Sequence, residues 1–138
     1  METIKFKLRN DISEVSRLHR LLEDFADSAG LGRNDLNSIN LAIEELFANV
    51  VNYGYPHDGT HWVDVRISIE DGHVAIRIVD DGVPFNPVVK GVPDTGCPVE
   101  KRRVGGLGIH LCRNLMDDIT YERDGPRNIV TLKKRLKG

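Results

Sequence analysis

The stretch WVDVRISIEDGHVAIRIVD, residues 62–80, decides the fold class of this chain. Its first half alternates apolar and polar side chains: Trp62, Val65, Ile67 and Ile69 interleave with Asp64, Arg66, Ser68 and Glu70. Asp71-Gly72 then matches a two-residue hairpin turn, and residues 73–79 continue as a second strand. Because such alternation is typical of a sheet with one buried face, we expect helices on only one side of it. Two layers are therefore favoured over three.

The segments before this hairpin predict one strand and two helices. Residues 4–8 alternate apolar and basic side chains, as a strand with one buried face does. Apolar residues recur at intervals of three and four over residues 12–29 and again over about 35–53, which predicts two amphipathic helices. Glycines follow both segments and are expected to end the helices.

The segments after the hairpin predict a long loop, a third helix and a closing hairpin. Residues 83–104 hold four of the six prolines, which exclude a helix or a central strand there. A third helix is expected over about residues 106–117, and residues 119–123 and 128–136 read as two paired strands. The expected order is therefore β, α, α, β, β, long loop, α, β, β.

Length and composition place the chain among ordinary globular proteins. A chain of 138 residues and 15.5 kDa is expected to form a single domain over residues 1–138. With 40% hydrophobic and 29% charged residues, disordered and fibrous classes are excluded, and a net charge of −2 favours neither nucleic acid nor an anionic membrane. Cys97 and Cys112 are too few for a disulfide framework, and no apolar run of about 18 residues occurs. We therefore expect a cytoplasmic protein.

The second predicted helix carries a polar column that its apolar stripe does not explain. At about 100° per residue, Glu45, Asn49 and Asn52 fall within roughly 60° of one another, and the apolar residues lie about 150° away. Such a column is either a solvated face or a site at which a carboxylate and an amide oxygen share a hard cation. Glu44 points about 100° away from the column, which favours Glu45 as the acting carboxylate.

Two glycine-containing segments are the other candidates for chemistry. Val79-Asp80-Asp81-Gly82-Val83-Pro84 is either a plain turn or a place where Asp80 accepts a hydrogen bond from a ligand amino group. Gly105-Gly106-Leu107-Gly108 stands at the expected start of the third helix, where exposed N–H groups can bind phosphate. This segment is neither a Walker A motif nor a Rossmann fingerprint, because no Gly-Lys-Ser/Thr follows it and no strand precedes it.

In this order, the motifs resemble those of the GHKL ATP-binding superfamily, and within it those of the anti-sigma factor serine/threonine kinases. Glu45-Leu46-Phe47-Ala48-Asn49, followed by Asn52-Tyr53-Gly54-Tyr55, resembles the N-box. The segment DDGVPFNP, residues 80–87, is similar to the Asp-x-Gly-x-Pro-Phe-Asp-Pro variant, and Gly105-Gly106-Leu107-Gly108 resembles the second glycine box. The resemblance implies a Bergerat-type α/β (α+β) two-layer sandwich, with a mixed, mostly antiparallel sheet and three helices on one face.

The resemblance also implies roles for individual residues. Glu45 would be the general base, and Asn49 would offer its amide oxygen to Mg²⁺ on the ATP phosphates. Asp80 would accept the adenine amino group with Thr131 in support, and Gly82 would let the backbone pass close to the base.

The long loop and the second glycine box would act on the ATP phosphates. The phosphates would meet N–H groups of a four-residue set: Gly105, Gly106, Leu107 and Gly108. Residues 83–104 would form the ATP lid, and Arg102 or Arg103 would either reach the γ-phosphate or remain a surface charge.

The activity implied by the resemblance is phosphoryl transfer from ATP to a serine or threonine of an anti-anti-sigma protein. The same chain would sequester an RNA polymerase sigma factor and form a homodimer through the uncovered sheet face. Alternatives are a non-catalytic, nucleotide-gated binding module, the ATP-binding domain of a histidine-kinase-like regulator, and a fragment of an ATP hydrolase or chaperone.

Overall fold

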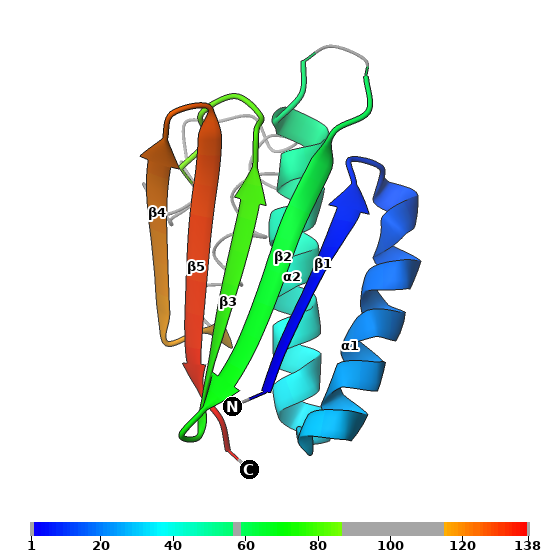
Figure 1. Cartoon of the computed structure of the whole chain (residues 1–138), viewed down its shortest axis with the longest axis vertical. Helices are drawn as coiled ribbons and strands as arrows, with labels where there is room; N and C mark the ends of the chain where they lie inside the picture. The colour runs from blue at the N-terminus through cyan, green and yellow to red at the C-terminus, as the bar shows by residue number, and fades with distance from the viewer. Residues whose placement is uncertain (1, 57–58, 87–114, 138) are drawn as a thin grey trace, which may run out of the picture.

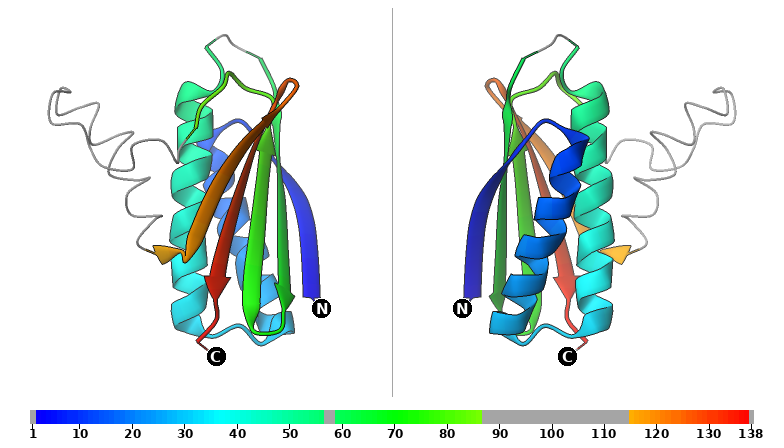
Figure 2. Two further views of the ribbon diagram at one scale, coloured as in Figure 1. Left: turned by 90° about the vertical axis from the view of Figure 1, so that its left-hand side faces the viewer. Right: turned by 90° about the vertical axis from the view of Figure 1, so that its right-hand side faces the viewer.

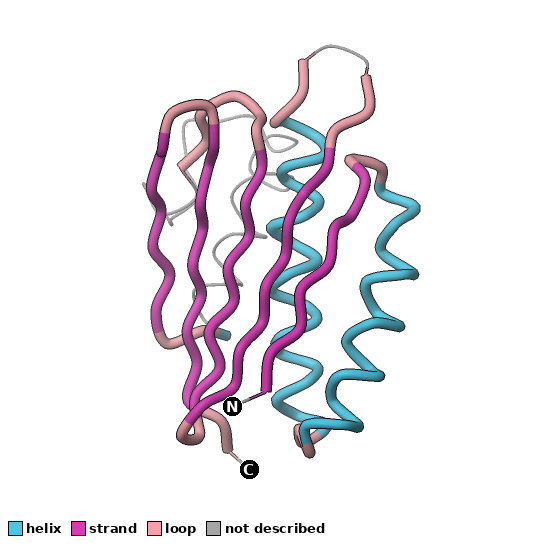
Figure 3. The backbone as a smooth tube through the Cα atoms, viewed as in Figure 1, coloured by secondary structure: helices cyan, strands magenta, loops and turns pink. Residues whose placement is uncertain are grey.

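The computed structural model describes residues 2–56, 59–86 and 115–137 of the chain. Five strands, two α-helices and one 3-10 helix occur in these ranges: β1 (Glu2–Arg9), η1 (Ile12–Glu14), α1 (Val15–Ala29), α2 (Arg33–Tyr53), β2 (Trp62–Glu70), β3 (His73–Asp80), β4 (Asp118–Asp124) and β5 (Arg127–Arg135). The path of the backbone through these elements is traced in Figure 3.

The strands form one sheet in the order β1-β2-β3-β5-β4, as Figure 1 shows. All four pairings in the described residues are antiparallel, whereas a mixed sheet was expected. Both hairpins predicted from the sequence are confirmed. The central pairing of β3 with β5 joins segments on either side of the long loop, and it sets Asp80 opposite Asn128.

Both α-helices lie on one face of the sheet, and the side views in Figure 2 show no described helix on the other face. The two-layer expectation is therefore confirmed. The layers meet in a continuous apolar core from both helices and all five strands, which includes Leu8, Leu18, Leu22, Ile39, Ile43, Phe47, Ile67, Ile76, Ile119 and Leu132. Burying each large side chain of this kind stabilises the fold by about 1.5–3 kcal/mol.

The first predicted helix is divided in the structure. The segment Ile12–Glu14 is a 3-10 turn, and α1 begins at Val15. The turn forms because the Asp11 carboxylate accepts a 3.0 Å hydrogen bond from the Ser13 N–H and caps it. At the other end, Gly30 adopts a φ of 72° and ends the helix in the left-handed conformation that glycine favours.

Trp62 lies on the outer face of the sheet, although it was grouped above with the apolar residues of the buried face. Its side chain is 51% exposed, whereas Val63 and Val65 are buried. The reason is the two-residue period of a strand, which sends positions 62 and 63 to opposite faces.

The third predicted helix and most of the predicted lid lie outside the described residues. Of residues 106–117, only the last three are described, and there Leu115 and Met116 pack against the apolar core. Two α-helices are therefore described where three were expected. Neither of them has the length and apolar character needed to cross a lipid bilayer.

Candidate functional site

The end of α2, the end of β3 and the start of β5 meet at one end of the sheet (Figure 1). A hollow at this end is lined by side chains of all three elements and by the segment that follows β3: Leu46, Asn49, Val50, Gly54, Ile78, Asp80, Val83, Phe85, Asn128 and Val130. Its walls are apolar, and its buried polar residues are two amides and one carboxylate. This composition suits a planar, largely apolar ligand with a few hydrogen-bonding atoms.

The polar column of α2 is not simply a solvated face. Asn49 is 4% exposed and lines the hollow, and its Nδ2 atom has no hydrogen-bond partner among the described residues. Because an unpaired buried N–H donor destabilises the fold, the place of Nδ2 in the lining of the hollow makes Asn49 a candidate for binding a ligand. Asn52, the third member of the column, is exposed.

Glu45 precedes Asn49 by one helical turn and is only partly exposed. Burial raises the pKa of its carboxyl group, and repulsion from Glu44 raises it further. Glu44 itself is drawn toward α1, where its Oε2 lies 3.1 Å from Nε2 of His19. A carboxylate with a raised pKa, one helical turn from an amide that lines the hollow, is a candidate general base.

Asp80, the last residue of β3, is 5% exposed. Its Oδ1 atom accepts two hydrogen bonds of 2.9 Å, one from the Gly82 N–H and one from Nδ2 of Asn128. Burial raises the pKa of Asp80 and repulsion from Asp81 adds to the rise, while these two hydrogen bonds and the charge of Arg123 oppose it. Both described hydrogen bonds reach Oδ1, so Oδ2 is the oxygen with which Asp80 can accept a bond from a ligand.

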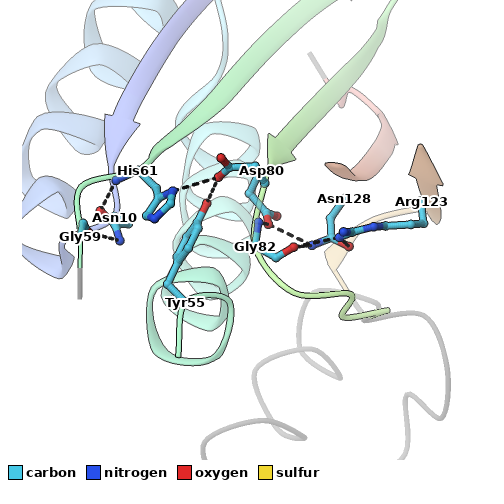
Figure 4. Close-up of polar contacts among 9 residues, drawn as sticks. Asn10, Tyr55, Gly59, His61, Asp80, Gly82, Arg123 and Asn128 are labelled. Carbon is cyan, nitrogen blue, oxygen red and sulfur yellow. Dashed lines mark hydrogen bonds and ion pairs between the residues drawn. The ribbon is translucent and has the colours of Figure 1, made fainter. Parts of the chain in front are cut away.

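Asn128 is a residue of this site that the sequence reasoning missed. It is 3% exposed and stands at the centre of a network with Asp80, Gly82 and Arg123, as Figure 4 shows. The sequence does contain a signal for it, because positions 128, 130 and 132 share one face of β5 and the other two are buried Val130 and Leu132. A polar residue on the buried face of a strand is expected to have a hydrogen-bonding partner.

Thr131 lies on the outer face of the sheet, away from the hollow. It pairs in register with Arg77, and the outer-face hollow that it lines is formed with Arg66, Ser68, Ala75, Ile76 and Arg77. The structure therefore does not bring Thr131 together with Asp80, and its expected support of adenine binding stays a prediction. Three positions separate it from Asn128, and an odd separation along a strand reverses the face.

Gly82 is required where the segment after β3 crosses the end of α2. A Cβ atom on Gly82 would lie 2.5 Å from the carbonyl oxygen of Gly54. The next residue, Val83, donates a 2.8 Å hydrogen bond from its N–H to that same oxygen. The close approach at this glycine is to the end of α2, and the expected approach to a bound base stays a prediction.

The hollow is narrow, and Phe85 is one of the residues that line it. The Phe85 ring stacks on Tyr53 with a centroid distance of 6.2 Å and an interplanar angle of 7°. Only about 20 Å³ of the hollow is open to the centre of a water molecule, which is room for about one water. A planar ligand enters this space only if lining side chains such as Phe85 and Val83 shift.

A second polar cluster holds the rim of the site together (Figure 4). The Tyr55 O–H donates a 2.8 Å hydrogen bond to Oδ1 of Asp81, and Nδ1 of His61 lies 3.4 Å from the same oxygen. The Tyr55 bond is the main cause that lowers the pKa of Asp81, whereas burial and this bond raise the pKa of Tyr55. The cluster links the chain after α2 to the end of β3.

Several expected site residues lie outside the described part of the chain: Arg102, Arg103, Gly105, Gly106, Leu107 and Gly108. Within the described ranges, no three His, Cys, Asp or Glu side chains cluster as a metal site would require.

Comparison with known proteins identifies the family. Residues 8–134 match the model of the histidine kinase-like ATPase domain. The chain belongs to the histidine kinase-like ATPase family. In this family, the hollow at the end of α2 is the candidate ATP site.

Two relatives within the family are serine-protein kinases named RsbW. The protein of Bacillus mycoides is 27% identical over 136 residues, which cover 96% of this chain and 84% of the relative. That of Oceanobacillus iheyensis is 32% identical over 110 residues, which cover 76% of this chain and 68% of the relative. These names support ATP-dependent serine kinase chemistry at the level of the family.

A solved structure confirms the histidine kinase-like fold. The RsbU and RsbW domains of a Mycobacterium tuberculosis protein superpose with a TM-score of 0.70 at 19% identity. The match covers 99% of this chain and 33% of that one. At this identity, the similarity establishes the fold alone.

Proposed function

We propose that this histidine kinase-like ATPase is a serine/threonine protein kinase that binds Mg-ATP in the hollow between α2, β3 and β5. The observation that carries the proposal is the buried pair of Asp80 and Asn49, which offer a carboxylate acceptor and an unpaired amide N–H donor to one ligand. Glu45 stands one turn before Asn49 and supplies a partly buried base.

Asp80 recognises the base of the nucleotide in this proposal. Its Oδ2 atom accepts a hydrogen bond from the exocyclic amino group of adenine, while Asn128 and the Gly82 N–H hold Oδ1. Ile78, Val130 and Leu46 supply the apolar walls that contact the faces of the ring. A charged acceptor in a largely apolar hollow distinguishes ligands by whether they bring a donor to it.

Asn49 and Glu45 act at the phosphate end of the ligand. The Asn49 amide oxygen is a suitable ligand for Mg²⁺, which supplies charge neutralisation to the ATP phosphates when it is bound. Glu45 accepts the proton of the attacking serine or threonine hydroxyl. The hydroxyl oxygen forms a bond to the γ-phosphorus, the bond from the γ-phosphorus to the bridging oxygen breaks, and ADP leaves.

The partners of the proposed kinase follow from the resemblance of its motifs to those of the anti-sigma factor kinases, and the relatives' names support the kinase activity alone. The substrate is an anti-anti-sigma protein, the sequestered partner is an RNA polymerase sigma factor, and the setting is the cytoplasm. The uncovered face of the sheet serves as the surface for a homodimer (Figure 2). Sedimentation at micromolar concentration tests the dimer, which a purely monomeric profile would contradict.

Labelled ATP tests the kinase itself. The chain is incubated with γ-labelled ATP, Mg²⁺ and a candidate partner encoded beside it, and the partner is analysed for phosphoserine and phosphothreonine. Label on either residue in the wild type, and none with Glu45→Gln, is the expected result. ATP binding without any transfer would favour the alternative of a nucleotide-gated binding module, and label on histidine would favour a histidine-kinase-like regulator.

A further inference from the structure

The amide of Asn128 is held in one orientation by groups on β4. Its Oδ1 atom accepts a 3.1 Å hydrogen bond from Nη1 of Arg123 and a 2.6 Å hydrogen bond from the Tyr121 O–H. Because a guanidinium group donates and never accepts, the atom that faces Arg123 must be the amide oxygen. The amide nitrogen is therefore turned toward the hollow.

That orientation presents donors to Asp80 and to the segment after β3. Nδ2 of Asn128 donates at 2.9 Å to Oδ1 of Asp80 and at 2.8 Å to the carbonyl oxygen of Val83. Arg123 completes the arrangement, because its Nη1 also donates at 2.8 Å to the carbonyl oxygen of Gly82. Strand β4, whose side chains do not line the hollow, thus determines which hydrogen-bonding character the hollow presents.

The state of the Asp80 carboxyl group decides which ligands it can accept. When ionised, it can only accept hydrogen bonds, and when protonated it can also donate one. Burial favours the protonated form of Asp80. Neither Asp81 nor Tyr55 favours the ionised form, because Asp81 carries a like charge and the Tyr55 O–H is bonded to Asp81. The groups that favour the ionised form are Asn128, the Gly82 N–H and Arg123, while Asn49 faces the hollow from α2.

We propose that Asn128, oriented by Arg123 and Tyr121, is the positioning residue that makes the site select a 6-amino purine over a 6-oxo purine. By donating to Oδ1, it keeps Asp80 an acceptor, so Oδ2 pairs with an amino group and repels a carbonyl oxygen. The inference rests on the proposed function, because it assumes that the hollow binds a nucleotide.

The test compares ATP with ITP, which carry an amino group and an oxo group at position 6 of otherwise similar bases. Dissociation constants are measured for the wild type and for Asn128→Leu between pH 5 and 8. The wild type is expected to prefer ATP by about tenfold or more, the value of one well-placed hydrogen bond. Asn128→Leu is expected to lose most of this preference, because a protonated Asp80 can donate to the oxo group. As the pH falls, whatever preference remains in the variant should disappear at a higher pH than in the wild type, since the Asn128 hydrogen bond that favours the ionised Asp80 is absent.

Two further variants separate selectivity from folding. Tyr121→Phe removes the hydrogen bond that Oδ1 of Asn128 accepts from outside the hollow. It is expected to reduce the preference for ATP over ITP, as the ratio of dissociation constants, about threefold, which corresponds to a partial loss of one hydrogen bond. Thr120→Val, on the outer face of the same strand, is the matched control and is expected to leave the ratio unchanged. Far-ultraviolet circular dichroism verifies that each variant is folded.

The outcomes distinguish this inference from the function beneath it. A purely structural role for Asn128 would weaken ATP and ITP binding equally, and an unchanged ratio and pH profile in Asn128→Leu and Tyr121→Phe would overturn the inference. A wild type that binds neither nucleotide would instead overturn the proposed function.

Discussion

Asp80 and Asn128 face each other across β3 and β5, and Nδ2 of Asn128 donates a 2.9 Å hydrogen bond to Oδ1 of Asp80. The two side chains are 5% and 3% exposed, which makes this one of the few buried polar contacts in the described chain. A carboxylate so far from water destabilises the fold unless donors surround it. Two donors, the Gly82 N–H and Nδ2 of Asn128, reach Oδ1 of Asp80, and Oδ2 is the oxygen with which we propose that it accepts a ligand.

Replacing Asp80 with Asn separates ligand binding from stability. Because burial raises the pKa of Asp80, the wild type loses stability as the pH rises from the ordinary Asp value of 3.8 through the raised pKa. Asp80→Asn removes this dependence and is expected to unfold in urea at an equal or higher concentration at pH 7. Nucleotide affinity should fall about tenfold or more, since the acceptor for the amino group is lost. Wild-type affinity in this variant, measured by calorimetry, would contradict the assignment.

The neighbouring carboxylates Glu44 and Glu45 allow a matched test of the general base. Glu45→Gln is expected to reduce phosphoryl transfer by about 10²–10⁴-fold with ATP binding largely kept. Glu44→Gln should retain transfer and shift its acidic limb to lower pH, because repulsion from Glu44 contributes to the raised pKa of Glu45. Transfer rises with pH through the pKa of the base. If Glu44→Gln abolishes transfer and Glu45→Gln does not, the two roles are reversed.

Gly82 offers a test of the contact between the end of β3 and the end of α2. A Cβ atom there would lie 2.5 Å from the Gly54 carbonyl oxygen, so Gly82→Ala is expected to lower the free energy of unfolding by about 1–3 kcal/mol. Nucleotide binding should weaken with it. The control is Gly72→Ala at the other end of the sheet, where φ is 77° and a Cβ atom would have no non-neighbouring atom within 4 Å. It should destabilise the fold and leave nucleotide affinity unchanged, and equal effects of the two variants on affinity would refute the prediction.

Phe85 tests whether the hollow must widen before a nucleotide enters. Phe85→Ala removes the ring that stacks on Tyr53. This variant is expected to raise the association rate of ATP about threefold or more, because the hollow is open to ATP in a larger fraction of the protein molecules. Stopped-flow fluorescence with a labelled nucleotide measures the rate. Leu41→Ala, on an exposed part of α2, is the control. An association rate lower than that of the wild type would show that the ring assists binding.

The outer face of the sheet carries a row of like charges. Lys5 pairs in register with Arg66, and Arg66 with Arg77, so three cations stand side by side on β1, β2 and β3. Relieving this repulsion by Arg66→Thr is expected to raise the free energy of unfolding by about 0.5 kcal/mol at low salt and by less at 1 M salt. Lys7→Thr is the control, because Lys7 lies 4.0 Å from the opposite charge of Asp64. A salt-independent gain would point to β-propensity instead.

Much of the fold could be predicted because it rests on patterns within single elements. The alternation around Val65 and Ile67 identified the central hairpin and its buried face, and both residues are at most 2% exposed. The four-residue spacing of Glu45 and Asn49 placed both on one side of a helix. The site could be predicted only where residues close in the sequence fix one another's positions, as in the turn in which the Gly82 N–H donates to Asp80.

The sequence by itself determined the elements, their buried faces and the residues that each motif brings together locally. Only the tertiary structure decided that Asn128 rather than Thr131 faces Asp80, because these residues lie on strands separated by the long loop. Alternation is a local property with a period of two, and a shift of one residue in the pairing of β5 would turn Asn128 to the outer face and Thr131 to the inner face. Register across such a separation is set by the packing of the whole core, which no single segment contains.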